Sequence, residues 1–403
     1  MKKFTLSSRL LIKKPRPYPL ASNVLASLAL LLVIPQSGRS GEKDVIEAKS
    51  TIEDAHRPSI YDKIWNLATL YKDSDNPYIQ EVKLRGRYQG QYHWLDSNQG
   101  DDNSWEDRRS RIGVDVKFLK QFAFRGDVQG SDGFDPVYNG VVDFYVKWSP
   151  SKSFNVTIGR QKPQIGHYDF VQSTNNQPTF ERSQIFNQLR VDRVVGGVVD
   201  GKQGNWIYRA GLYSNEIDLE FGSFDAGIAF STGIGYDLAE AFGLDKAEVD
   251  LDYLHSDIQS NSTILNRYEN LISATLWLEQ ERWGFVAEGF AGSGNSPDAA
   301  GFFLQTTYDL LPEMLQLVGR YSYSNGDGAD SVIAQSRYER RAPQLTGGGR
   351  GEHYHAVYTG LQYFIYGDKL KLMAGSEYST VEGGGNGGDF DGWTHFAGVR
   401  VSF

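Results

Sequence analysis

The chain has 403 residues, of which 40% are hydrophobic and 23% charged, and its mean hydropathy is -0.45. This composition excludes a helical membrane protein, which needs several runs of about 20 apolar residues. The absence of cysteine excludes a disulfide scaffold, thiolate metal sites and cysteine nucleophiles. Glycine and tyrosine are frequent, with 44 and 23 residues. Low hydropathy with many glycines and aromatics favours an all-β chain, in particular a membrane barrel in which apolar and polar residues alternate.

Residues 1–40 are predicted to be a signal peptide. Their first part carries six basic residues and no acid, and the largely apolar run Val24–Ile34 follows it. These eleven residues are too few to cross a bilayer but suit the hydrophobic region of a cleavable export signal. A mitochondrial-type presequence and a retained interfacial helix are weaker alternatives. Cleavage is expected within Pro35–Gly41.

Removal of the signal makes the chain more acidic. Residues 1–40 hold seven of the 41 basic residues and none of the 50 acids, which leaves 34 basic residues and a net charge of -16 instead of -9. This acidity argues against nucleic-acid binding. A chain without cysteine also suits passage through an oxidising periplasm. We therefore expect a location in the bacterial outer membrane.

The mature chain is predicted to hold two parts. Residues 41–78 are expected to form a periplasmic lead segment, and residues 79–403 a single barrel. The lead is polar and acidic at first, and its apolar stretch 59–71 is expected to dock, for example at the barrel mouth.

From Ile79 on, the sequence alternates with a period of two. Between Val82 and Trp94, one face carries Val, Leu, Gly, Tyr and Trp, and the other carries Lys, Arg, Gln and His. Successive side chains of a strand point to opposite faces. In a membrane barrel the apolar face meets lipid and the polar face meets the water of the lumen.

The same alternation predicts sixteen antiparallel strands, although it is weak in two of them. The strands are expected near 79–95, 106–118, 122–129, 142–148, 154–160, 190–199, 206–214, 224–236, 247–255, 268–279, 283–290, 301–310, 314–324, 353–366, 369–379 and 394–403. Seven short connections alternate with eight longer ones, as in an even-stranded barrel with both termini in the periplasm. A soluble sandwich has no reason for this alternation.

Aromatic residues support the same fold class. Seven tryptophans fall mostly near strand ends, where they are expected to form interfacial girdles: Trp94, Trp105, Trp148, Trp206, Trp277, Trp283 and Trp393. The chain ends in Phe403, on one face with Val399 and Val401. A last strand that ends in Phe resembles the assembly signal of bacterial outer-membrane proteins.

Two stretches resemble the phosphate-selective porin O/P family. Ile158–Ser183 is similar to the family signature, in which a strand ends in a lysine–proline turn and a Glu-Arg-Ser follows in the third loop. Asp107–Phe118 resembles the family's double-arginine strand. The resemblance implies a homotrimer of sixteen-stranded barrels. It also implies that the third loop folds inward to narrow the pore, and that arginines form a ladder toward an anion-binding constriction.

The candidate pore-lining and anion-binding residues are basic residues of the first four strands. They are Lys83, Arg85, Arg87, Arg108, Arg109, Arg111, Lys117, Arg125 and Lys147. Alternation places eight of them on the lumen face, and the resemblance adds Arg108. Fixed cations concentrate anions in a narrow passage, and the planar fork of arginine suits oxyanions. The alternative is a self-neutralised wall in which these cations pair with Asp115, Asp127 and Asp143.

The connection 161–189 is expected to form the constriction, because Ile165, Tyr168 and Phe170 suit a loop inside the barrel. The alternative is an extracellular lid that makes trimer contacts. The candidate constriction residues are Arg160, Lys162, Asp169, Glu181 and Arg182. In the stretch 167–179, where phosphate-selective members place lysine, this chain has Asp169 and no Lys or Arg.

The acidic strand faces at Glu248, Asp250, Asp252 and Glu288 are expected on the opposite wall. A metal site within Glu248–Asp257 is possible by spacing, but a hydrated lumen face is the more common use of such residues. No metal ligand, cofactor or catalytic residue is therefore assigned.

The sequence thus predicts no enzyme but an outer-membrane porin. Its water-filled channel would pass small solutes by diffusion, with anions such as phosphate favoured. The expected partners are outer-membrane lipid, small anionic solutes and further copies of the chain in a homotrimer. The alternative is a structural or adhesive outer-membrane barrel that does not conduct, in which the lead 41–78 tethers peptidoglycan or fills the lumen.

Overall fold

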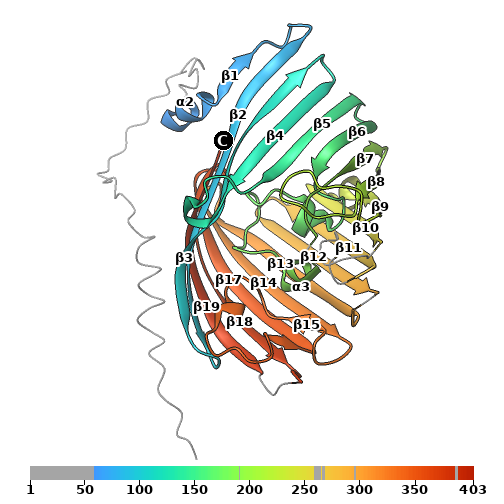
Figure 1. The fold of residues 1–403 in the computed structure, drawn as a ribbon. Helices are drawn as coiled ribbons and strands as arrows, with labels where there is room; N and C mark the ends of the chain where they lie inside the picture. The colour runs from blue at the N-terminus through green and yellow to red at the C-terminus, as the bar shows by residue number, and fades with distance from the viewer. Residues whose placement is uncertain (1–58, 190, 258–264, 266–267, 295, 386–388) are drawn as a thin grey trace, which may run out of the picture. The chain divides into compact units, whose positions relative to one another are not determined.

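The computed structural model describes residues 59–189, 191–257, 265, 268–294, 296–385 and 389–403 (Figure 1). The signal peptide expected at 1–40 and the first part of the lead segment lie outside this range. Over the described range, no helix has the length and the hydropathy that a membrane crossing requires.

Within the described range, sixteen antiparallel strands form a closed barrel, as predicted. They are β2 (Ile79–Ser97), β3 (Asp102–Phe118), β4 (Phe122–Gly130), β5 (Val141–Ser151), β6 (Phe154–Gln161), β7 (Val194–Gln203), β8 (Trp206–Ser214), β9 (Ile228–Asp237), β10 (Lys246–Ser256), β11 (Asn270–Gln280), β12 (Trp283–Ser293), β13 (Ala299–Leu311), β14 (Leu315–Gly326), β17 (His353–Tyr366), β18 (Leu370–Glu382) and β19 (Phe390–Ser402). Neighbours in sequence pair with one another, and β19 pairs with β2 to close the ring.

Alternation along the strands sorts the side chains as the sequence predicts. In β9, Ile228, Phe230 and Ile234 are exposed on the outer wall, whereas Ala229 and Ser231 between them are buried. The outer apolar face is the one that meets lipid in a membrane barrel.

The aromatic girdles lie at both ends of the strands. Near the short turns, Phe122 stacks on Phe118 and on Trp148. Trp277 departs from the expected girdle, because the register of β11 turns it toward the lumen, where its ring meets the Tyr168 ring edge to face at 4.9 Å between centroids.

The barrel closes beside the chain's C-terminus. The backbone of Phe403 exchanges two hydrogen bonds with Gly86 of β2, at 3.0 and 3.1 Å. A Cβ atom at position 86 would lie 2.3 Å from the Phe403 ring. A side chain at position 86 would therefore displace the terminal aromatic ring from its place across β2.

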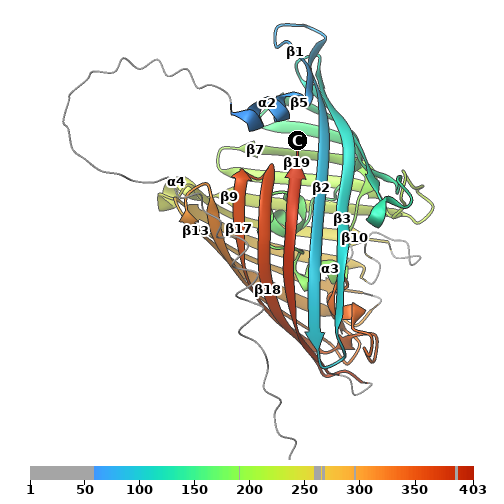
Figure 2. The ribbon, with the colours of Figure 1, turned by 90° about the vertical axis from the view of Figure 1, so that its left-hand side faces the viewer.

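Two short elements precede β2, in the part of the chain that the sequence analysis assigns to the lead segment. Helix α2 (Ile60–Asn66) begins at a capping box made by Ser59 and Asp62. Its Trp65 indole donates to the backbone oxygen of Ser402, at 2.6 Å. Strand β1 (Thr69–Lys72) pairs with β2, so the sheet begins before residue 79 (Figure 2).

The third long connection, residues 162–193, folds into the barrel as predicted and is called the third loop below. It contains the π-helical turn η2 (His167–Val171) and the helix α3 (Gln184–Leu189). Its apolar side chains pack in one cluster with inward residues of the wall such as Phe290 and Phe303. The burial of Ile165, Tyr168 and Phe170 explains why these residues occur in a connection.

A second loop also folds inward, which the sequence analysis did not predict. Residues 327–352, the stacked loop below, contain β15 (Val332–Ile333), η3 (Glu339–Arg341) and β16 (Arg350–Gly351). This loop lies against α3, where the Gln188 side chain donates to the Ser331 backbone oxygen at 2.7 Å. The remaining elements are η1 (Asp132–Phe134) and α4 (Ala239–Phe242) in other connections.

Candidate pore constriction

The third loop is held against the barrel wall by buried polar side chains of the strands. Glu288 of β12 is one anchor: its carboxylate accepts hydrogen bonds from the backbone N–H groups of Tyr168 and Asp169, at 2.9 and 2.8 Å. The hydroxyl of Thr275 donates to the same carboxylate at 2.7 Å. Glu288 is 1% exposed, so its carboxyl oxygens are satisfied by the loop and by Thr275 rather than by water.

Arg400 of β19 is the second anchor. Its guanidinium donates to four backbone oxygens of the third loop, at 2.8 to 3.2 Å: those of Thr174, Gln177, Thr179 and Phe180. Arg320 of β14 acts in the same way, donating to the backbone oxygen of Glu181 at 2.8 Å and pairing with Glu377 at 3.3 Å. Strand alternation places both arginines inward, but nothing in the sequence alone tells that they bind backbone oxygens of the loop.

A β-bulge brings two adjacent arginines to the lumen. The register of β2 and β3 shifts by one residue between Gln89 and Gly90, where Gln89 pairs with Arg109 and Gly90 with Asp107. The extra residue, Arg108, breaks the alternation and turns inward beside Arg109. Arg108 forms a two-pronged ion pair with Glu181 of the third loop, at 2.6 and 3.0 Å.

The ion pair fixes the protonation of Glu181. Burial by itself would raise the pKa of this carboxyl, but the charge of Arg108 and its hydrogen bonds outweigh burial and hold the pKa well below its ordinary value. Glu181 therefore stays charged and keeps the loop bound to β3.

Three of the predicted constriction residues form hydrogen bonds within the third loop and stabilise its conformation. The Lys162 ammonium donates to the backbone oxygens of Phe170 and Gln172, at 2.5 and 3.1 Å. The Asp169 carboxylate accepts from the backbone N–H of Ser183 at 2.9 Å and from its hydroxyl at 2.6 Å. Arg182 donates to the backbone oxygen of Asp169 at 2.8 Å.

The assignment of Arg160 to the constriction loop was wrong. Arg160 belongs to β6 and pairs with Phe144, which is 44% exposed on the outer wall. Cross-strand partners share a face, so Arg160 faces away from the lumen. Its guanidinium donates to the backbone oxygens of Val141 and Asp218.

A cavity of about 540 Å³ lies between the third loop and the wall formed by β2 and by β4 to β8. Nine basic residues and only two aspartates border it: Arg85, Arg87, Arg125, Lys147, Lys152, Lys162, Arg193, Lys202 and Arg209, with Asp143 and Asp200. Five of these nine are predicted site residues. Arg193, Lys152, Lys202 and Arg209 were missed, although alternation within β8 could have found Arg209.

The other predicted basic residues do not border this cavity. Arg108 and Arg109 lie under the third loop, where Arg109 donates to Gln89 at 2.8 Å. Lys117 is at the turn end of β3, paired with Glu81, and its side chain is 65% exposed. Lys83 and Arg111 are the remaining two, and Arg111 pairs across the strands with Arg87.

Some of these cations are paired with carboxylates, as the alternative of a self-neutralised wall predicts. Arg125 forms a two-pronged pair with Asp115 at 2.8 and 3.0 Å, and Arg85 lies 3.5 Å from the same carboxylate. Arg193 pairs with Asp143 at 2.6 Å. For Arg87 and Arg111, the described residues offer no carboxylate within ion-pair distance, and the Nε atoms of both are buried without a hydrogen-bond partner.

Comparison with known proteins confirms the fold and the family resemblance. Residues 82–270 match the model of the family described as phosphate-selective porin O and P. Among curated proteins, no match to the chain is found.

Several solved structures are similar to this chain in fold. OmpF of Salmonella typhi, in complex with daunomycin, aligns with a TM-score of 0.57 at 12% identity, over 83% of this chain and 100% of that one. OprB of Pseudomonas putida has a TM-score of 0.57 at 12% identity, over 80% and 94%. The outer-membrane channel DcaP of Acinetobacter baumannii has a TM-score of 0.52 at 12% identity, over 83% and 99%. The family match and the porin fold indicate an outer-membrane channel rather than an enzyme.

Proposed function

We propose that the protein is an outer-membrane porin through which small anions, such as phosphate, diffuse passively. One observation carries the proposal: nine lysine and arginine residues and only two aspartates border the cavity beside the third loop. Fixed charges of one sign in a narrow passage of low dielectric raise the local concentration of counter-ions. The channel therefore needs no chemical step to favour anions.

The arginine pair Arg87 and Arg111 supports a preference for oxyanions. Each has a buried Nε–H group without a partner among the described residues. A buried donor without an acceptor is unfavourable by about 1–3 kcal/mol. Of the two, Arg87 borders the cavity, and an oxyanion accepts from arginine in two-pronged geometry, so a phosphate in the cavity would satisfy the Nε–H of Arg87 once its side chain turns toward the cavity.

Reversal potentials across planar bilayers in asymmetric KCl test the preference. We expect the wild-type channel to be anion-selective and inorganic phosphate to reduce its chloride current. The variant Arg87→Glu places a carboxylate at the cavity. It should move the reversal potential toward the value of a cation-selective channel.

Lys117→Glu is the matched control. It makes the same change of charge on the neighbouring strand, but Lys117 is 65% exposed and does not border the cavity. Its reversal potential should stay close to that of the wild type. A cation-selective wild-type channel, or equal shifts in both variants, would contradict the proposed role of the cavity.

A barrel that does not conduct is the second candidate function. It is favoured by the two inward loops, whose contacts at α3 are buried, as shown by Gln188, which donates to both Ser331 and Tyr268. The same recordings decide between the two functions. Stepwise conductance supports the porin, and its absence at every voltage supports a structural or adhesive barrel.

We also propose that the chain is exported by its N-terminal signal and forms a homotrimer in the outer membrane. The resemblance to the porin family implies that three copies of the chain assemble. Leu219, in the connection between β8 and β9, lies beside β5, where its backbone oxygen accepts from Val141, and its side chain is 61% exposed and free to contact a second copy. Light scattering in mild detergent should give a trimer, and Leu219→Asp should weaken it. Phe242→Asp, an equally exposed position at the turn end, is the control, and a monomeric wild type would contradict the trimer.

A further inference from the structure

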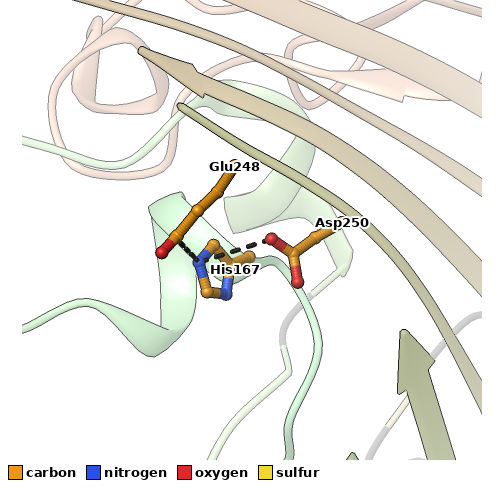
Figure 3. A group of neighbouring side chains, drawn as sticks. All are labelled: His167, Glu248 and Asp250. Atoms are coloured by element: carbon orange, nitrogen blue, oxygen red, sulfur yellow. Dashed lines mark hydrogen bonds and ion pairs between the residues drawn. The ribbon is translucent and has the colours of Figure 1, made fainter. Parts of the chain in front are cut away.

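His167 of the third loop meets two carboxylates of β10 on the lumen face of the barrel (Figure 3). Its Nε2 atom lies 3.1 Å from Glu248 Oε2 and 3.5 Å from Asp250 Oδ2. The three donor atoms lie within 4.8 Å of one another. Glu248 and Asp250 are two positions apart on one strand, so alternation points both side chains at the loop.

One oxygen of this cluster lacks a hydrogen bond. Asp250 Oδ2 is buried without a hydrogen-bond partner, in a residue that is 5% exposed. The other oxygen, Oδ1, accepts from Arg209 at 2.7 Å, and Arg209 also binds Asp252. Arg209 thereby orients the Asp250 carboxylate so that its free oxygen faces His167, as outer-sphere partners orient metal ligands.

The spacing of the donors fits a small divalent cation. Zinc binds imidazole nitrogen and carboxylate oxygen at about 2.0–2.2 Å, and neighbouring ligands of a tetrahedral ion at that distance lie about 3.3–3.6 Å apart. The two measured separations, 3.1 and 3.5 Å, are close to this range. Calcium and magnesium prefer sites made of oxygen only, so the histidine favours a first-row transition ion.

We propose that His167, Glu248 and Asp250 bind one divalent transition-metal cation, with zinc as the best-fitting ion. His167 also borders the cavity, so a fourth ligand position is accessible to water or to an anion. Bound metal would tie the third loop to β10 and add positive charge to the cavity. The site does not depend on conduction, so its test is separate from that of the proposed function.

The Lys246 ammonium would compete with the metal cation for the Glu248 carboxylate. Its ammonium lies 3.1 Å from Glu248 Oε2, the same oxygen that faces His167. It also lies 3.4 Å from the centre of the Trp277 ring, where it can stay when a metal takes the carboxylate. Removing this charge should therefore strengthen metal binding, whereas it would weaken a cluster that is held together only by ion pairs.

Isothermal titration of the detergent-solubilised full chain, free of any histidine tag, with ZnCl2 tests the proposal. We expect one saturable site per chain. His167→Ala, Glu248→Gln and Asp250→Asn should each weaken zinc by more than the about 10- to 100-fold that outer-sphere partners contribute. Lys246→Gln should bind zinc more tightly than the wild type.

His255→Ala is the matched control. His255 is on the same strand and lies 3.4 Å from Asp257, but it is not part of the three-donor cluster. It should leave zinc binding unchanged, and excess CaCl2 should not displace the ion. Circular dichroism confirms that each variant is folded. The absence of saturable zinc binding to the folded wild type, or unchanged binding in all three ligand variants, would overturn the proposal.

A fluorescence readout locates the ion independently of affinity. The Trp277 ring lies 5.9 Å from the His167 ring, between centroids. CuCl2 bound at the cluster should quench Trp277, and Trp277→Phe should remove the quenched fraction. Quenching that persists in Trp277→Phe but disappears in His255→Ala would place the ion elsewhere and contradict the site.

Discussion

The two sides of the lumen use inward polar residues in different ways. On the side of β2 and β4 to β8, basic side chains such as Arg87 and Arg125 border an open cavity. On the side of β12 to β19, equally inward residues such as Glu288, Arg320 and Arg400 are occupied by the third loop. An arginine on the lumen face is therefore a pore residue only where it borders the cavity that the loop leaves open.

The physical reason is the need of buried backbone groups for partners. The third loop has little regular structure, so many of its carbonyl groups lack partners within the loop. Arg400 supplies donors for four of them. On the open side, Arg87 contacts only the side chains of Ser173 and Thr174 in the loop, and Arg125 is paired with Asp115, but both arginines border the cavity.

The largest effect is expected from a substitution that removes contacts between the third loop and the wall of β12 to β19. Arg400→Met keeps the unbranched stem of the side chain but leaves four buried carbonyls without their donor, each unfavourable by about 1–3 kcal/mol. The third loop should detach, single-channel conductance should rise, and limited proteolysis should cut within residues 162–193. Arg125→Met on the open side is the control and should leave the loop intact. If Arg400→Met keeps the conductance and the protease resistance of the wild type, the two sides do not differ as described.

A second substitution removes the ion pair that joins β3 to the third loop. Glu181→Gln leaves Arg108 buried without its partner, which is unfavourable by about 3–5 kcal/mol. The melting temperature should fall and the current noise should rise, as checked by calorimetry and single-channel recording.

Because Arg108 lowers the pKa of Glu181 against the effect of burial, the stability that the charged Glu181 contributes is complete above its ordinary pKa. That contribution is lost only as the pH falls through the lower pKa of the folded protein, so acidification to pH ~5 should leave the wild-type loop bound.

A change of salt should affect the open side alone. The screening length falls from about 10 Å at 0.1 M to about 3 Å at 1 M. Selectivity that arises from the cations around the cavity should therefore decrease over this range, whereas the buried contacts of Arg400 should hold the loop throughout. Reversal potentials at several mean KCl concentrations measure the first effect, and protease resistance at the same concentrations measures the second. A selectivity independent of salt would argue against fixed charge as its cause.

The smallest expected effect is a pH response of the stacked loop. Burial, with the charge of Glu377 adding to it, raises the pKa of Glu339 to about 7. The stability gained from protonation is fully present below the ordinary pKa and is lost as the pH rises through about 7. Amide exchange of residues 332–342, corrected for its intrinsic pH dependence, should increase as the pH rises from about 5 to about 7 and should level off above that pH. Glu339→Gln should remove this increase, and an unchanged profile in the variant would show that another group is responsible.

The strands were predictable because alternation is a local property. Sixteen strands, the polar lumen face and the inward third loop are all confirmed. Weak alternation led to an early start for β7, which begins at Val194. The inward position of Arg108 follows from a bulge, which alternation cannot reveal, and only the family resemblance pointed to this residue.

The sequence by itself determined which residues face the lumen and which face lipid, since each strand position has one of two directions and only one suits the membrane. Only the tertiary structure decided which lumen residues are free. That depends on where two loops, distant in sequence from the strands they cover, find partners for their backbone groups. The same holds for His167, Glu248 and Asp250, which come together only because the third loop crosses the lumen to β10.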